Sequence, residues 1–275
     1  MNAPDLAAPD LEAYERDGFL VLEDFLPPAD CDALQARVVE LVAAFDPGPA
    51  RTVFSARDQS HARDRYFQDS GGAIRFFFEE QATDLPVSLA LNKIGHALHD
   101  LDPVFDRVSR HKRLAAQAQA LGFVQPLLLQ SMYLFKQPHI GAEVDWHQDA
   151  SYLHTRPSTV TGFWIALDDA DRDNGCLMAL PGAHHGPLRE RFVRDGDRMV
   201  TRVLDATPWP DIAPVALEAR RGTLVVLHGL LPHASGPNRS SRARHAYALH
   251  LIDGRAEYAT DNWLQRPEQP LRGFS

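Results

Sequence analysis

From about residue 127 onward, the sequence is a succession of short β-type segments separated by turn residues. Short apolar segments at regular spacing, punctuated by turn signals, are typical of an antiparallel sandwich or barrel. One such signal, Asp173-Asn174-Gly175, predicts a hairpin turn. The expected strands are the one that carries His147 and those at residues 127–137, 161–167, 176–180, 222–227 and 244–252. We therefore expect a mainly β fold with flanking helices.

The first part of the chain has helical spacing. Residues 27–45 begin with two prolines, and their apolar residues then recur at helical intervals. We expect further helices at 92–99, which includes Lys93, and at about 103–120. No linker separates independent domains, so we predict one domain over residues 1–275. It would have a helix-rich part over about 1–125 and a jelly-roll core over about 126–255.

Composition limits the class of protein. The chain has 275 residues, a formal net charge of −9 and two distant cysteines. This length can bury a sizeable core, the negative charge disfavours non-specific nucleic-acid binding, and the cysteines do not form a secreted disulfide scaffold. The N-terminus lacks a basic segment followed by an apolar one, and no apolar run approaches the ~20 residues that span a bilayer. We expect a cytoplasmic protein with no nucleic-acid or membrane partner.

The stretch VDWHQDASYL places His147 and Asp149 two positions apart. On a β-strand, residues i and i+2 point to the same face, so the imidazole and the carboxylate would project side by side. They are two of the three ligands of the 2-His-1-carboxylate triad that binds non-haem iron. The pair alone is weak evidence in a chain with 13 histidines, so a third ligand and a cosubstrate anchor are needed.

The third ligand is sought among the histidines of the β region. His233 follows a strongly apolar strand and stands at a turn, where a side chain can face a cavity. His228 is the competing candidate. We expect His250, on the last strand, to be a hydrogen-bonded core histidine. The adjacent His184 and His185 would point in opposite directions on a strand, and we assign them to a loop.

A candidate anchor for a dicarboxylate cosubstrate follows His233 in the sequence. Arg244 begins the next strand, and a guanidinium can pair bidentately with a carboxylate. If the two strands are neighbours, Arg244 would lie one 2-oxoglutarate length from the metal, and Ser235 could add a hydroxyl. Arg242 faces the same way on an extended strand and is the alternative anchor.

These residues, together with DGFLVLEDFL, SMYLFKQP, NGCLMALPGAHH and HGLLPHASG, resemble the phytanoyl-CoA dioxygenase family over nearly the whole chain. The resemblance implies a double-stranded β-helix (a jelly-roll, cupin-like core) and an iron(II)- and 2-oxoglutarate-dependent oxygenase. It implies that His147, Asp149 and His233 hold the metal. It also implies a 2-oxoglutarate site lined by Lys93, Met132, Trp164, Ser235 and Arg244.

The implied reaction is hydroxylation of a C–H bond by dioxygen, with succinate and CO2 as co-products. Related halogenases lack the carboxylate ligand, so Asp149 favours hydroxylation. We expect a small organic or acyl substrate, because the overall acidity argues against a broad phosphate site. Two other classes fit the donor set: a non-enzymatic, cupin-like metal- or ligand-binding protein, and a zinc hydrolase, which would need no arginine anchor. The sequence does not predict the oligomeric state.

Overall fold

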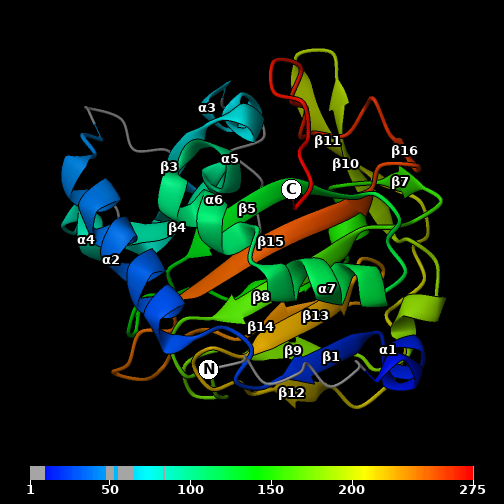
Figure 1. Ribbon diagram of the computed structural model, residues 1–275, viewed down its shortest axis with the longest axis horizontal. Helices are drawn as coiled ribbons and strands as arrows, with labels where there is room; N and C mark the ends of the chain where they lie inside the picture. The colour runs from blue at the N-terminus through cyan, green and yellow to red at the C-terminus, as the bar shows by residue number, and fades with distance from the viewer. Residues whose placement is uncertain (1–9, 48–52, 55–64, 83, 275) are drawn as a thin grey trace.

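The centre of the molecule is a sheet of eight strands in the order β1-β13-β8-β15-β5-β4-β3-β2 (Figure 1). All neighbours pair antiparallel except β2 and β3. The computed structural model describes residues 10–47, 53–54, 65–82 and 84–274. In sheet order, the strands are β1 (Phe19–Leu22), β13 (Leu224–His228), β8 (Thr161–Ala166), β15 (Ala246–Asp253), β5 (Pro126–Leu134), β4 (Leu91–His96), β3 (Ile74–Glu79) and β2 (Val53–Phe54).

A smaller sheet packs against one face of the large one. It consists of β12 (Val215–Leu217), β9 (Leu177–Ala179), β14 (His233–Ser235) and β6 (Val144–His147), in that order. An apolar cluster that includes Leu177 and Leu217 of the small sheet and Val225 of the large sheet fills the space between them. Two two-stranded ribbons, β10 (Glu190–Asp195) with β11 (Arg198–Val203) and β7 (Thr155–Arg156) with β16 (Glu257–Tyr258), complete the β structure. The mainly β, jelly-roll expectation is confirmed.

Helices cover the other face of the large sheet, where α2, α6 and α7 lie across the strands (Figure 1). Phe163 and Leu249 of the sheet pack with Leu34 of α2 and Phe105 of α6. The helices are α1 (Leu11–Asp17), α2 (Pro28–Ala44), α3 (Arg65–Gln68), α4 (Val87–Ala90), α5 (Leu98–Leu101), α6 (Pro103–Ser109) and α7 (Lys112–Ala120). The 3-10 turns are η2 (Ser70–Gly72), η3 (Glu80–Ala82), η4 (Asp149–Ser151) and η5 (Ala183–His185).

Successive residues of the central strands therefore serve two layers. Phe163 and Leu249 face the helices, whereas their neighbours Trp164 and Ala248 belong to the cluster between the sheets. This alternation is the period-2 rule of strands applied to a sheet buried on both faces. The face of the large sheet that points toward the small sheet, called the inner face below, can therefore place polar residues in a cavity.

Three sequence-based expectations are corrected. The segment at 92–99 is not a helix, because residues 91–96 form strand β4 between β3 and β5. The expected helix at 103–120 is two helices, with His111 capping the start of α7 through its ring nitrogen. The turn at 173–175 links the large sheet to the small one rather than closing a hairpin.

Strands from both the N-terminal part and the core part belong to the large sheet, and the extent of the domain stays a prediction. Within the described ranges, none of the helices combines the length and the apolar character that crossing a membrane would require.

Candidate active site

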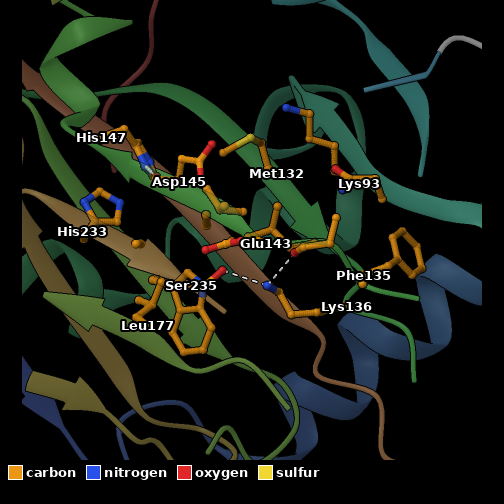
Figure 2. A pocket seen from close by; sticks show the side chains of 18 of the residues that line it. Lys93, Met132, Phe135, Lys136, Glu143, Asp145, His147, Leu177, His233 and Ser235 are labelled. Carbon is orange, nitrogen blue, oxygen red and sulfur yellow. Dashed lines mark hydrogen bonds between the residues drawn. The ribbon is translucent and has the colours of Figure 1, made fainter. Parts of the chain in front are cut away.

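Two histidines meet across the small sheet. His147 ends β6 and His233 begins β14, and the two residues are direct partners in the antiparallel register. Their ring centroids are 4.2 Å apart, and Figure 2 shows them side by side. The Nδ1 of His147 donates to Asp145 O at 2.8 Å and that of His233 to Leu231 O at 3.0 Å. Because a carbonyl can only accept, these bonds fix the tautomer and leave both Nε2 atoms for a metal.

The carboxylate of the triad comes from a turn, not from the strand. Strand β6 ends at His147, and Asp149 begins η4. The next residue anchors this turn, because Ala150 N donates to Gly229 O at 2.9 Å. Asp149 Oδ1 lies 3.8 Å from the Nε2 of His147 and 3.8 Å from that of His233. The expected shared strand face is therefore wrong, yet one ligand atom from each residue falls within 4.8 Å of the others.

Two residues of the large sheet lie against the Asp149 carboxylate. Gly162 of β8 and His250 of β15 are register partners. A Cβ at Gly162 would lie 3.0 Å from Asp149 Oδ2, so a residue without a side chain gives the carboxylate room. His250 Nε2 donates to the same Oδ2 at 3.2 Å and leaves Oδ1 facing the two histidines. His250 is therefore a hydrogen-bonded histidine, as expected.

The electrostatics of the triad suit a cation. Burial lowers the pKa of His147 to about 4, so its imidazole is neutral at pH 7. Burial alone would raise the pKa of Asp149, but the neighbouring His250 and His233 lower it well below its usual range. Two neutral imidazoles and one ionised carboxylate are the donor set that binds iron(II) with open positions.

One cavity of about 860 Å³ contains the triad and extends along the inner face of the large sheet. Arg244, two residues before β15, lines this cavity and is only 3% exposed. Its Nε and Nη1 atoms have no hydrogen-bond partner among the residues that the structure describes. The guanidinium carbon lies 5.4 Å from the ring centroid of Trp164. A buried cation with unpaired N–H groups is costly unless an anion binds there.

The other predicted cosubstrate residues line the same cavity. Ser235 lies two positions after the triad histidine of β14 and so shares its face. Met132 and Trp164 flank Ala248 in one row across β5, β15 and β8. Lys93 reaches the cavity from β4, and burial lowers its pKa to about 7. The structure thus gathers all eight predicted site residues around one cavity.

The competing candidates point elsewhere. His228, at the end of β13, packs against Tyr14 and His184, with ring centroids 6.1 Å and 5.0 Å away. Arg242 forms an exposed ion pair with Asp171, with 2.5 Å between nitrogen and oxygen. Neither His228 nor Arg242 lines the cavity.

A second group of cavity residues is mainly aromatic and adjoins the triad through Tyr152, whose ring centroid is 6.1 Å from that of His147. Phe192 and Trp263 belong to the same cluster as Ile252, at the end of β15 away from Arg244. Glu190, the first residue of β10, lines this part, and burial raises its pKa. Its carboxylate forms no hydrogen bond or ion pair with other described residues.

Among the charged residues of the cavity that sequence reasoning missed are Glu190 and Lys136. For Lys136 a signal existed, because Gln130, Met132 and Leu134 alternate with it along one strand direction and all line the cavity. For Glu190 the signal was the hairpin turn Gly196-Asp197, which joins β10 to β11, but the flanking strands are largely polar and gave no clear strand pattern.

Comparison with known proteins agrees with this geometry. The model of the family "Phytanoyl-CoA dioxygenase (PhyH)" matches residues 14–246. The chain is 44% identical to bovine phytanoyl-CoA dioxygenase domain-containing protein 1, covering 97% of each chain. It is 40% identical to a phytanoyl-CoA dioxygenase of Arabidopsis thaliana, covering 94% of each.

Among solved structures, the epimerase SnoN in complex with Fe3+, alpha ketoglutarate and nogalamycin RO has the same fold. The TM-score is 0.67 and the identity 19%, covering 95% of this chain and 91% of that one. Family model, full-length relatives and fold agree: the chain belongs to the phytanoyl-CoA dioxygenase family.

Proposed function

We propose that this dioxygenase uses iron(II) and 2-oxoglutarate to hydroxylate a C–H bond of a small organic or acyl substrate. The observation that carries the proposal is that a metal-binding triad and a buried guanidinium with unpaired N–H groups share one cavity. When bound, iron and 2-oxoglutarate supply the oxidising chemistry: one atom of dioxygen enters the substrate and the other enters succinate, with loss of CO2.

The protein's task at the metal is to present three ligand atoms in fixed orientations. The Nε2 atoms of His147 and His233 would bind the ion, because each Nδ1 is tethered to a backbone carbonyl. Asp149 would bind through Oδ1 while His250 holds Oδ2. With an iron(II) ion, this set has one net positive charge, which favours an anionic cosubstrate.

The protein's task at the cosubstrate is to fix a dicarboxylate at both ends. One end would approach the metal, and the distal carboxylate would receive the free N–H groups of Arg244 and the hydroxyl of Ser235. Ala248 adds only a small side chain to the cavity wall, and the ring of Trp164, its register partner, packs against the guanidinium of Arg244. Holding the reacting groups in place and keeping water away are the main contributions of such a site.

The substrate would bind in the aromatic part of the cavity, next to Tyr152. The uncompensated carboxylate of Glu190 suits a substrate with a hydrogen-bond-donating group. Glu80, Glu143 and Asp145 line the same cavity and are exposed, so phosphate-rich ligands such as acyl-CoA would meet negative charge there. A small molecule is therefore favoured over an acyl-CoA.

The test is succinate formation by the purified protein. The protein is loaded with iron(II) without oxygen, mixed with 2-oxoglutarate, exposed to air and assayed for succinate, alone and with a library of metabolites. We expect slow, iron-dependent succinate release that a true substrate accelerates. The hydroxylated product is then identified by a mass increase of one oxygen atom.

Two results would contradict the proposal. If iron and 2-oxoglutarate bind but no succinate forms with any compound, the non-enzymatic, cupin-like alternative is favoured. If zinc supports hydrolysis of an ester or amide while 2-oxoglutarate has no effect, the site is a hydrolase.

A further inference from the structure

A second buried cation lies beside the proposed carboxylate anchor. Lys136 follows β5, is 5% exposed and lines the cavity. Figure 2 shows its side chain directed at Ser235. Its Nζ donates to Ser235 Oγ at 2.8 Å, to Ala142 O at 2.9 Å and to Gly236 O at 2.5 Å. An ammonium group has three N–H donors, so all three are used.

The fold provides a slot for this side chain. A Cβ at Gly141 would overlap Lys136 Cγ, and a Cβ at Gly175 would lie 2.8 Å from Lys136 Cδ. The backbones of Lys136 and Arg244 are joined directly, since Arg244 N donates to Lys136 O at 3.0 Å. Two glycines and a backbone hydrogen bond therefore place both cations at the same end of the cavity.

Charge at this end is unbalanced. Among the described residues, no carboxylate lies within ion-pair distance of either Lys136 or Arg244. Burial, and after it the positive charge of Arg244, lowers the pKa of Lys136 to about 7, although the carboxylates of Glu79 and Glu143 act in the opposite direction. Two buried cations without a carboxylate in direct contact are costly, and a bound dicarboxylate would offset that cost.

The contact between Lys136 and Ser235 decides what the serine can do. A serine hydroxyl has one proton and two acceptor lone pairs. Because Lys136 donates to Ser235 Oγ, the hydroxyl proton is not needed for that contact and can point into the cavity.

We propose that Lys136 is a positioning residue that acts through Ser235: it orients the serine hydroxyl to donate to the distal carboxylate of 2-oxoglutarate. The pair would thereby help the site to select a dicarboxylate over a monocarboxylate. This inference rests on the proposed function, because it assumes that 2-oxoglutarate binds with its distal carboxylate at Arg244.

The experiment compares two ligands that differ at the distal end alone. 2-Oxopentanoate has the five-carbon 2-oxo acid chain of 2-oxoglutarate with a methyl group in place of the distal carboxylate. The Kd of each ligand is measured by calorimetry on iron(II)-loaded, oxygen-free protein. The proteins are the wild type, Lys136→Met, Ser235→Ala and the double variant.

We expect Lys136→Met to weaken 2-oxoglutarate binding about tenfold, which corresponds to about 1.4 kcal/mol. Binding of 2-oxopentanoate should change less than about twofold, because no distal carboxylate is present to receive the serine proton. Ser235→Ala should have a similar effect. The double variant should bind 2-oxoglutarate no more weakly than whichever single variant has the higher Kd. Such non-additivity identifies two residues that act as one unit.

Equal weakening of both ligands by Lys136→Met would overturn the inference, because a merely structural role affects the whole cavity. Multiplying effects in the double variant would also overturn it, since the residues would then act independently. If Lys136→Met does not fold, Lys136→Leu, which also lacks a donor for Ser235, is judged by the same two-ligand criterion. A wild type that fails to bind or convert 2-oxoglutarate refutes the proposed function instead.

Discussion

The two ends of the active-site cavity are built differently. At one end, Arg244, Lys136 and Ser235 are almost fully buried and stand on or next to strands of the two sheets. At the other end, Tyr152 follows a 3-10 turn and Glu190 begins a two-stranded ribbon outside both sheets. Strand ladders fix side-chain directions more firmly than short turns do. The cationic end is thus held by the two sheets, whereas the aromatic end depends on peripheral segments.

The ends also differ in charge. Arg244 and Lys136 have no carboxylate within ion-pair distance among the described residues, whereas burial raises the pKa of Glu190 in the aromatic part. An anion at the first end and a hydrogen-bond donor at the second would each relieve the cost of burial. This contrast supports our proposal that 2-oxoglutarate and substrate bind on opposite sides of the metal.

The largest expected effect lies between the two ends, at the metal itself. Asp149→Ala removes the carboxylate ligand, and we expect succinate formation to be abolished while the thermal unfolding transition remains. His228→Ala is the matched control, because this histidine lies outside the cavity. Unchanged turnover of Asp149→Ala would refute the ligand assignment.

The next largest effect tests the cationic end. Arg244→Met removes the buried guanidinium that would pair with the distal carboxylate of 2-oxoglutarate. Truncating one partner of a buried charge pair costs several kcal/mol, so the KM for 2-oxoglutarate should rise about a hundredfold or more. Arg242→Met should leave it unchanged, because Arg242 pairs with Asp171 on the surface. If Arg242→Met has the larger effect, the anchor is misplaced by two residues.

A stability measurement tests the cost of cations on the cavity wall. Burial lowers the pKa of Lys93 to about 7, below its ordinary value of 10.5. The unfolded chain therefore holds more protons above pH 7, and the ligand-free protein should gain stability as the pH rises. From pH 7 to pH 9, this lysine should contribute about 2 kcal/mol. In Lys93→Met, the free energy of unfolding measured by urea denaturation should rise less between pH 7 and pH 9 than in the wild type. An equal rise in both proteins would show that Lys93 is not the source.

The smallest effect tests the aromatic end. Glu190→Gln keeps the shape of the side chain and removes its charge. We expect substrate-independent succinate release to stay at the wild-type rate while the KM for the true substrate rises about tenfold, as for the loss of one hydrogen bond to a charged group. Glu80→Gln, an exposed residue of the same cavity, is the control. A change in the substrate-independent rate would show that Glu190 acts on the cosubstrate instead.

The contrast between residues on sheet strands and residues on turns also explains which site residues the sequence could predict. His147, His233 and Ser235 lie at or next to strongly patterned strands, where spacing of two residues reports a shared face. Arg244 is predicted from its place at the start of the last expected strand, after His233. Asp149 was identified through its spacing from His147, although a turn rather than the strand delivers it.

The remaining features depend on distant packing. Two features join segments that are far apart in the chain: the hydrogen bond from His250 to Asp149 and the slot formed by Gly141 and Gly175. No local sequence pattern could predict them. Lys93 was assigned to a helix because its short apolar segment fits both periods, and only the flanking strands β3 and β5 decide for β structure.

The most direct test of the central claim is a crystal structure of the protein with iron(II) and 2-oxoglutarate, grown without oxygen, with the iron located by anomalous scattering. We expect a single iron bound by the Nε2 atoms of His147 and His233 and by Asp149, and a distal carboxylate between Arg244 and Ser235. An iron peak away from these three residues, or a distal carboxylate directed at the aromatic end, would contradict it.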